Sequence, residues 1–181
     1  MPLDLSALHT AGIAASAQEF DREPYRRDLW PRTTLELTRN HLPPAPAAVA
    51  WPTSAAQVRT IIDWAVQRGV PLVPFGAGSG VCGAAAGREG SLAVDTKRMD
   101  AVLEFDPDER TVRVQPGILG QHLEDILEPM GWMTAHSPSS IMCSTVGGYV
   151  AARSAGQFSS RYGVFDDMLL AASAECPTRS L

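Results

Sequence analysis

The pattern of apolar and polar residues predicts a strand, a helix and a second strand between residues 49 and 75. Residues 49–52 form a short apolar run, and the segment 54–57 (Ser-Ala-Ala-Gln) has the composition of a helix capping box. Apolar residues then recur at spacings of three and four, as on one face of a helix: Val58, Ile61, Ile62, Ala65 and Val66. Gly69 is a typical helix end, and the apolar run 70–75 predicts the second strand.

The following segments predict a further strand, a hairpin and another helix. Residues 91–95 are mostly apolar, and residues 101–105 and 111–115 alternate like half-buried strands around a turn-forming Asp-Pro-Asp-Glu sequence. Apolar spacing predicts a helix over 119–128, which Pro129 and Gly131 end. This order predicts an α+β fold with mixed sheets and flanking helices.

The proline-rich segment 43–46 divides the chain into two predicted regions. Consecutive prolines favour an extended linker and stop a helix. We therefore expect a polar, helical lead-in with its linker over residues 1–46 and the main domain over residues 47–181.

Composition narrows the classes of partner. The net charge of −5 argues against nucleic acid or an anionic membrane surface, and no apolar run is long enough for a membrane span. The N-terminus lacks the layout of a signal peptide, and the three cysteines are widely spaced, which favours free thiols and a cytoplasmic location. No histidine or cysteine cluster has the spacing of metal ligands. Lys97 is the only lysine, which suggests a GC-rich bacterial source.

A glycine-rich loop directly after the strand 70–75 is the strongest chemical signal. Glycine adopts positive φ without steric cost and lets backbone N–H groups approach an anion. The loop residues are Gly76, Ala77, Gly78, Ser79 and Gly80. From these residues alone, a phosphate cradle and a plain flexible turn are equally good interpretations.

The loop does not fit the NAD-type dinucleotide fingerprint, although Asp95 follows at about the expected distance. That fingerprint requires the glycines to open a helix. Three further glycines in residues 81–90, and the strand that follows at once, leave no room for one.

The segment 137–156, rich in serine, glycine and alanine, is the second candidate site. It is interpreted either as a polar wall around a planar ligand or as the start of a helix packed closely through Gly147 and Gly148. Ser144 or Thr145 is the expected cap of a helix that begins near Val146.

Several motifs in this order resemble the FAD-binding domain of the vanillyl-alcohol oxidase (PCMH-type) flavoproteins, and most of all alkyldihydroxyacetonephosphate synthases. The matching segments are 51–53 (Trp-Pro-Thr), 74–80, 94–99 (Val-Asp-Thr-Lys-Arg-Met), 114–117, 136–140, 144–156 and 161–163. The resemblance begins near Ala47 and extends to the end of the chain.

The resemblance implies a set of cofactor-binding residues. Pro74, Phe75, Gly76, Ala77, Gly78, Ser79 and Gly80 would hold the FAD pyrophosphate, whereas Ser139, Ser140, Ser144, Thr145, Gly148, Ala152, Arg153, Ser154 and Ala155 would form two further flavin-binding segments. In relatives with covalent flavin a histidine of the phosphate loop or the cap domain forms the bond. No histidine lies between His41 and His122, so we expect non-covalent FAD.

Three side chains near these segments have predicted environments. His136 is interpreted as a satisfied loop histidine or, less favourably, a flavin contact. Cys143 is expected to be a small buried residue, because no basic partner is adjacent. Arg153 has small, apolar neighbours and is expected to contact the cofactor or pack, not to lie in solvent.

By the same resemblance, relatives continue into a substrate-binding cap domain that carries most catalytic groups, and this chain is expected to be truncated. Substrates in the family include 2-hydroxy acids and the alkyl or acyl precursors of ether lipids. The sequence therefore leaves three hypotheses: the FAD-binding portion of a flavoenzyme, a non-catalytic flavin-binding module completed by a separate cap polypeptide, or an inactive fragment.

Overall fold

The computed structural model describes residues 3–177, and the chain divides into two compact units. The unit that we call the sheet unit comprises Met1–Arg98 and Ser173–Leu181, of which 3–98 and 173–177 are described. The hairpin unit comprises Met99–Ala172. The family-like segments identified in the sequence fall in both units.

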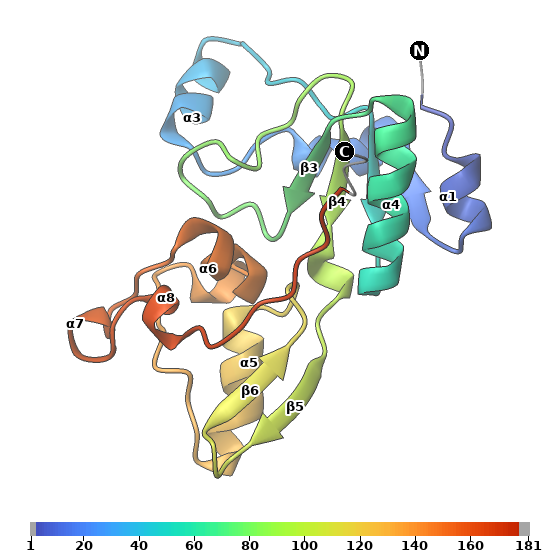
Figure 1. The fold of residues 1–181 in the computed structure, drawn as a ribbon. Coiled ribbons are helices and arrows are strands. Elements are labelled where there is room, and N and C mark those ends of the chain that lie inside the picture. Colours follow the sequence, from blue (N-terminus) through green and yellow to red (C-terminus); the bar gives the residue numbers. More distant parts are fainter. Residues whose placement is uncertain (1–2, 178–181) are drawn as a thin grey trace. The chain divides into compact units, whose positions relative to one another are not determined.

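The sheet unit contains a four-stranded mixed sheet (Figure 1). Its elements are α1 (Ser6–Thr10), β1 (Ala14–Ser16), α2 (Glu19–Arg22), η1 (Glu23–Tyr25), α3 (Pro31–Thr38), β2 (Ala48–Trp51), α4 (Ala55–Arg68), β3 (Leu72–Phe75), β4 (Leu92–Asp95) and η2 (Thr96–Arg98). The strand order is β1-β2-β4-β3, in which β2, β4 and β3 are parallel and β1 pairs antiparallel with β2.

Both faces of this sheet are covered. Alternate residues of β2 and β4 pack on α1 and α4, which runs beside β4 in Figure 1, through Leu8, Ile61, Trp64 and Ala65. Val49 and Ala93, which point to the opposite face, pack with Tyr25 and Phe75. The lead-in thus contributes a strand and part of the core, in addition to the helices that the sequence predicts.

The predicted helix over 54–69 is confirmed, with one difference at its cap. The Ser54 hydroxyl accepts from the backbone N–H of Gln57 at 3.3 Å, as a capping box requires. The Gln57 side chain instead accepts from the backbone N–H of Thr53 at 2.8 Å. Gly69 ends the helix in the left-handed conformation, with φ 63°.

The hairpin unit packs a helix on a two-stranded sheet. Its elements are β5 (Val102–Asp106), β6 (Thr111–Val114), α5 (Gly120–Leu127), η3 (Glu128–Met130), η4 (Ile141–Cys143), α6 (Val146–Ala152), α7 (Ser159–Tyr162) and α8 (Phe165–Met168). β5 and β6 are antiparallel, as predicted. Ile118, Leu123 and Leu127 form the buried core against the inner side chains of the hairpin.

The predicted α+β fold with mixed sheets and flanking helices is confirmed. The predicted division at residue 46 stays a prediction.

Candidate functional site

The glycine-rich loop begins where β3 ends, and its backbone donors are uncommitted. Gly78 has φ +69°, a backbone conformation that residues other than glycine rarely adopt. None of the backbone N–H groups from Ala77 to Cys82 donates a hydrogen bond to a group within residues 3–177. Residues 77–79 are half-buried and residues 80–82 are exposed, and a run of N–H groups without a protein acceptor is a ready set of donors for an anion.

The ring of Phe75 supports this loop from below. A Cβ added at Gly78 would lie 2.6 Å from Cζ of Phe75, so the backbone rests directly on the ring. Phe75 is buried and meets Tyr25 edge to face, with ring centroids 4.8 Å apart. Pro74, in contrast, is exposed. The buried ring of Phe75 therefore contacts the loop backbone at Gly78 and supports it.

The lead-in packs along the rest of the loop. The backbone N–H of Leu29 donates to the carbonyl of Gly80 at 2.9 Å. A Cβ at Gly83 would lie 2.6 Å from the Trp30 ring, and Gly87 donates its N–H to the Arg26 carbonyl at 3.0 Å. These contacts fix both the middle and the end of the glycine-rich segment 76–90.

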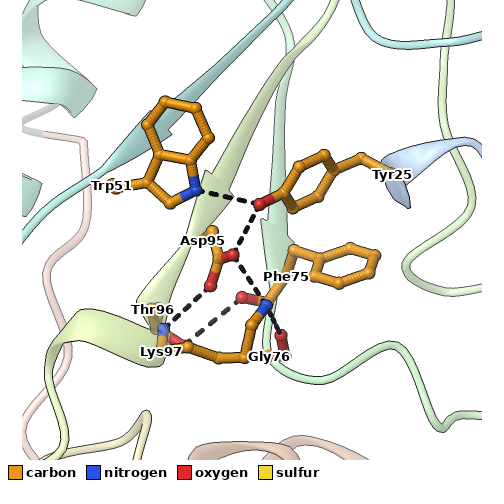
Figure 2. A network of polar contacts seen from close by, with 7 residues as sticks. All are labelled: Tyr25, Trp51, Phe75, Gly76, Asp95, Thr96 and Lys97. Carbon is orange, nitrogen blue, oxygen red and sulfur yellow. Dashed lines mark hydrogen bonds and ion pairs between the residues drawn. The ribbon is translucent and has the colours of Figure 1, made fainter. Parts of the chain in front are cut away.

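A buried carboxylate joins the loop region to the lead-in (Figure 2). Asp95, 2% exposed, ends β4, and its Oδ2 accepts from the Tyr25 hydroxyl at 2.6 Å. The Trp51 indole N–H donates in turn to the Tyr25 oxygen at 2.9 Å. Burial and the neighbouring Asp95 carboxylate raise the pKa of Tyr25 far above its ordinary value, so the hydroxyl keeps its proton and remains a donor.

Lys97 links the same carboxylate to the first residue of the loop. Its ammonium lies 2.6 Å from Oδ2 of Asp95 and 2.9 Å from the carbonyl oxygen of Gly76. The Thr96 hydroxyl donates to the Phe75 carbonyl at 3.4 Å. Figure 2 shows the two groups reaching across from η2 to the end of β3. The parallel register that places Phe75 opposite Asp95 brings these residues together.

The second candidate segment, in the hairpin unit, is organised by a helix start. Thr145 caps α6 by accepting from the backbone N–H of Gly148 at 3.2 Å. Gly147 packs on Pro116, since an added Cβ would lie 2.7 Å from the proline Cβ. The close-packing interpretation of these glycines therefore holds for Gly147. Ser144 is buried and hydrogen-bonds Ser140, with its hydroxyl 2.7 Å from the Ser140 carbonyl.

His136 is buried among aromatic side chains and contacts Ser154, one of the predicted cofactor-binding residues. Its Nε2 is 3.0 Å from the Ser154 hydroxyl, and its ring meets the rings of Tyr149 and Phe165 edge to face. Nδ1 is buried and has no hydrogen-bond partner within residues 3–177. Burial lowers the pKa of His136, against a weaker opposing effect of Glu124. One ring nitrogen of His136 thus has a hydrogen-bond partner and the other has none within residues 3–177, so the structure does not decide between a satisfied loop histidine and a flavin contact.

The exposed residues of these segments include two corrections. Arg153 was expected to avoid solvent, yet its side chain is 81% exposed and pairs with Asp166 at 2.6 Å. Its backbone has φ 51° at the end of α6, where the chain turns outward and carries the side chain into solvent. Cys143 is exposed on η4, so its predicted burial is wrong. Ser139, Ala152 and Ala155 are also exposed.

The structure thus gathers the predicted site residues into two groups. Residues 74–80 are together in the sheet unit, and residues 139–155 are together in the hairpin unit. Sequence reasoning missed Tyr25, Trp51 and Lys97 as neighbours of the loop. A usable signal for Lys97 was its position two residues after the end of a strand parallel to the one that leads into the loop.

The described part of the chain holds neither a membrane-spanning helix nor a cluster of metal-binding side chains. Within residues 3–177, no helix is long and apolar enough to cross a membrane. In the same range, no group of three or more histidine, cysteine, aspartate or glutamate side chains could hold a metal ion.

Comparison with known proteins identifies the family. A sequence model described as FAD binding domain matches residues 46–178. The alkyldihydroxyacetonephosphate synthase of Caenorhabditis elegans is 31% identical over 147 residues, covering 79% of this chain and 25% of that protein. The glycolate oxidase subunit GlcD of Bacillus subtilis (strain 168) is 33% identical over 125 residues, covering 68% of this chain and 27% of that protein.

A solved structure gives the same relationship. An alkyldihydroxyacetonephosphate synthase superposes with a TM-score of 0.78 at 29% identity, over 84% of this chain and 29% of that one. The chain therefore spans about a quarter of the length of the curated relatives that it matches. The resemblance inferred from the sequence motifs is confirmed: this chain belongs to the FAD binding domain family.

Proposed function

We propose that this chain is the FAD-binding portion of an FAD-linked oxidoreductase or of an alkyldihydroxyacetonephosphate synthase-like flavoenzyme, and that it holds FAD non-covalently. The observation that carries the proposal is the run of uncommitted backbone N–H groups from Ala77 to Cys82, directly after β3. A pyrophosphate offers several acceptor oxygens and negative charge, which such a run of donors satisfies. The donor set of the loop therefore fits the cofactor that the family implies.

Within this proposal each loop residue has a part. Gly76, Ala77, Gly78, Ser79 and Gly80 present the backbone to the pyrophosphate, and Phe75 holds the loop in place from below. Gly78 is required for its left-handed backbone and for its contact with the ring.

The hairpin unit supplies the other proposed flavin-binding residues. They are Ser139, Ser140, Ser144, Thr145, Gly148, Ala152, Arg153, Ser154 and Ala155. The hydrogen bonds of Ser144 and Ser154 to Ser140 and His136 support the view that these segments have fixed conformations.

The chemistry assigned to the chain is binding and orientation. When bound, the flavin supplies the redox chemistry, and the protein positions it. The relatives named above include an alkyldihydroxyacetonephosphate synthase and a glycolate oxidase subunit, so we propose a 2-hydroxy acid or an alkyl or acyl lipid precursor as the substrate class. A cap polypeptide is the proposed source of the groups that contact the substrate.

Three exposed, unpaired cysteines support a cytoplasmic location.

The test is a titration of the purified chain with FAD, followed by flavin fluorescence, with acid precipitation of the saturated protein. We expect saturable binding at one FAD per chain and release of all flavin into the acid supernatant. Binding that does not saturate contradicts the proposed function, whereas flavin retained in the pellet contradicts only the non-covalent attachment.

A further inference from the structure

Lys97 places a positive charge at the start of the glycine-rich loop. It is the only lysine of the chain and follows β4 by two residues. Its ammonium is 2.9 Å from the carbonyl of Gly76, the residue that precedes the run of uncommitted N–H groups. The side chain remains 40% exposed, so it is open to solvent.

The ammonium has one hydrogen-bond donor to spare. An ammonium carries three N–H donors. One donates to Asp95 and one to Gly76, and within residues 3–177 no third acceptor is in reach. A donor and a positive charge thus lie at the carbonyl of the residue that directly precedes the backbone donors, which themselves have no acceptor within residues 3–177.

The surroundings of Lys97 hold it in this position. Asp95, its charge partner, is buried and also accepts from the backbone N–H of Lys97 at 2.8 Å and from the Tyr25 hydroxyl. The ammonium lies 5.0 Å from the ring centroid of Phe75 and 5.7 Å from that of Tyr25, within the range of cation–π attraction. Because the side chain is already ordered, little conformational entropy is lost when it binds a ligand.

The ion pair between Lys97 and Asp95 also neutralises the buried charge of this region. Asp95 would by itself present a buried negative charge close to a loop that is proposed to bind an anion. Lys97 cancels that charge, since the ammonium and carboxylate are 2.6 Å apart. Removal of Lys97 therefore costs a donor and exposes the ligand to an uncompensated carboxylate.

We propose that Lys97 is a phosphate-binding residue of the glycine-rich loop, whose third N–H donates to a pyrophosphate oxygen of the cofactor. This inference rests on the proposed function, because it takes FAD as the ligand of the loop. The competing role is a latch that only ties the loop to β4 through Gly76 and makes no contact with the ligand.

The chain offers a direct test in its unaltered form. Since Lys97 is the only lysine, this side chain and the N-terminus are the only amines that an acetylating reagent modifies, and mass spectrometry distinguishes them from acetylated cysteine thiols. Mass spectrometry of the digested protein then gives the acetylation rate of Lys97. We expect saturating FAD, and inorganic pyrophosphate by itself, to slow this rate about 10-fold, because a charge-assisted contact ties up the amine. Riboflavin, which has no phosphate, serves as the control and leaves the rate unchanged.

Variants give the second measurement. K97M should weaken FAD binding about 10-fold, the loss expected for one hydrogen bond to a charged group. K97R should restore affinity to within about 3-fold, because it keeps the charge although not the same geometry. R98M is the matched control: it removes one positive charge at the next residue, whose guanidinium lies over Trp51 and not at the loop. Circular dichroism and thermal unfolding establish that each variant is folded.

The outcomes separate the hypotheses. An acetylation rate that FAD and pyrophosphate leave unchanged assigns Lys97 to the latch and overturns the inference, as does unchanged FAD affinity in K97M. If K97M does not fold, the acetylation measurement on the unaltered chain decides. A chain that binds no FAD at all contradicts the proposed function itself, whereas FAD binding without protection of Lys97 contradicts this inference alone.

Discussion

The imidazole Nε2 of His136 lies 3.0 Å from the hydroxyl oxygen of Ser154, which is one of the proposed flavin-binding residues of the hairpin unit. The other ring nitrogen is buried without a partner within residues 3–177. Protonation of the ring makes both nitrogens donors and creates a buried charge whose Nδ1–H has no acceptor, which is consistent with the lowering of the pKa of this histidine by burial.

This burial predicts that the chain loses stability in mild acid. The pKa of His136 is lowered from 6.5 in the folded chain, so below about pH 6.5 the unfolded chain binds the proton more readily. The free energy of unfolding should therefore fall as pH decreases from 6.5 towards the folded-state pKa. Above about pH 6.5 it should be independent of this group. Urea unfolding at a series of pH values measures the effect.

Two variants identify the responsible group. H136Q removes the titration and should flatten the dependence of stability on pH in that interval. H41Q removes an imidazole whose side chain is 71% exposed, and should retain the dependence. An unchanged slope in H136Q would assign the effect to another group.

Gly78 should tolerate substitution less well than another left-handed glycine of the same unit. G78A and G90A both place a side chain at positive φ, near +69° and +74°, which costs about 1 to 2 kcal/mol. Only at Gly78 does the new Cβ meet the Phe75 ring, whereas nothing lies within 4 Å at Gly90. G78A should therefore destabilise the chain more and weaken FAD binding, while G90A retains FAD affinity.

The double variant G78A/F75L tests the cause. If the ring contact is responsible, urea unfolding should show that G78A costs less stability in an F75L chain than in the unaltered chain. An equal cost in both chains would mean that the backbone conformation alone accounts for the loss.

Two substitutions of Arg153 should differ in their effect on Tm but not in their effect on FAD affinity. Its φ of 51° favours glycine, and its ion pair with Asp166 is largely exposed, so the pair contributes little. R153G should therefore raise Tm, whereas R153A, which keeps the strained backbone, should not. If Arg153 binds FAD as proposed, both variants lose about 10-fold in affinity. Equal FAD affinity in all three chains would remove Arg153 from the proposed site.

Tyr25 should contribute strongly to the stability of the sheet unit. Y25F removes a donor to the buried Asp95 carboxylate and leaves the Trp51 indole N–H without its acceptor. Hydrogen bonds to charged groups are worth about 1.5 to 3 kcal/mol, so we expect a loss of at least that order. Y162F, at a tyrosine that is 45% exposed, is the matched control, and comparable losses in urea unfolding of both variants would contradict the assignment.

Features set by neighbouring residues were predictable from the sequence. The cap at Ser54, the left-handed end at Gly69 and the antiparallel hairpin each depend on one short run of consecutive residues, and each is confirmed. The family was also accessible, because its motifs occur in a fixed order.

Features set by long-range contacts were not predictable from the sequence. The pairing of Ala15 with Ala50 makes a strand of a lead-in that shows no strand pattern, and the register of Phe75 with Asp95 brings Lys97 to the loop. The environment of Arg153 was misjudged because its small neighbours suggested packing, whereas the direction of a side chain at a helix end depends on the backbone turn.

The contacts of residues 25–30 with the glycine-rich segment bear on how this protein can be shortened. The matched family segment begins at residue 46, and a domain boundary drawn from it would discard Tyr25, Leu29 and Trp30. Such a shortened chain would also leave β2 with an open edge where β1 now pairs. An expression boundary at residue 46 would thus remove packing contacts of the glycine-rich segment and leave β2 as an aggregation-prone edge strand, although every family motif would still be present.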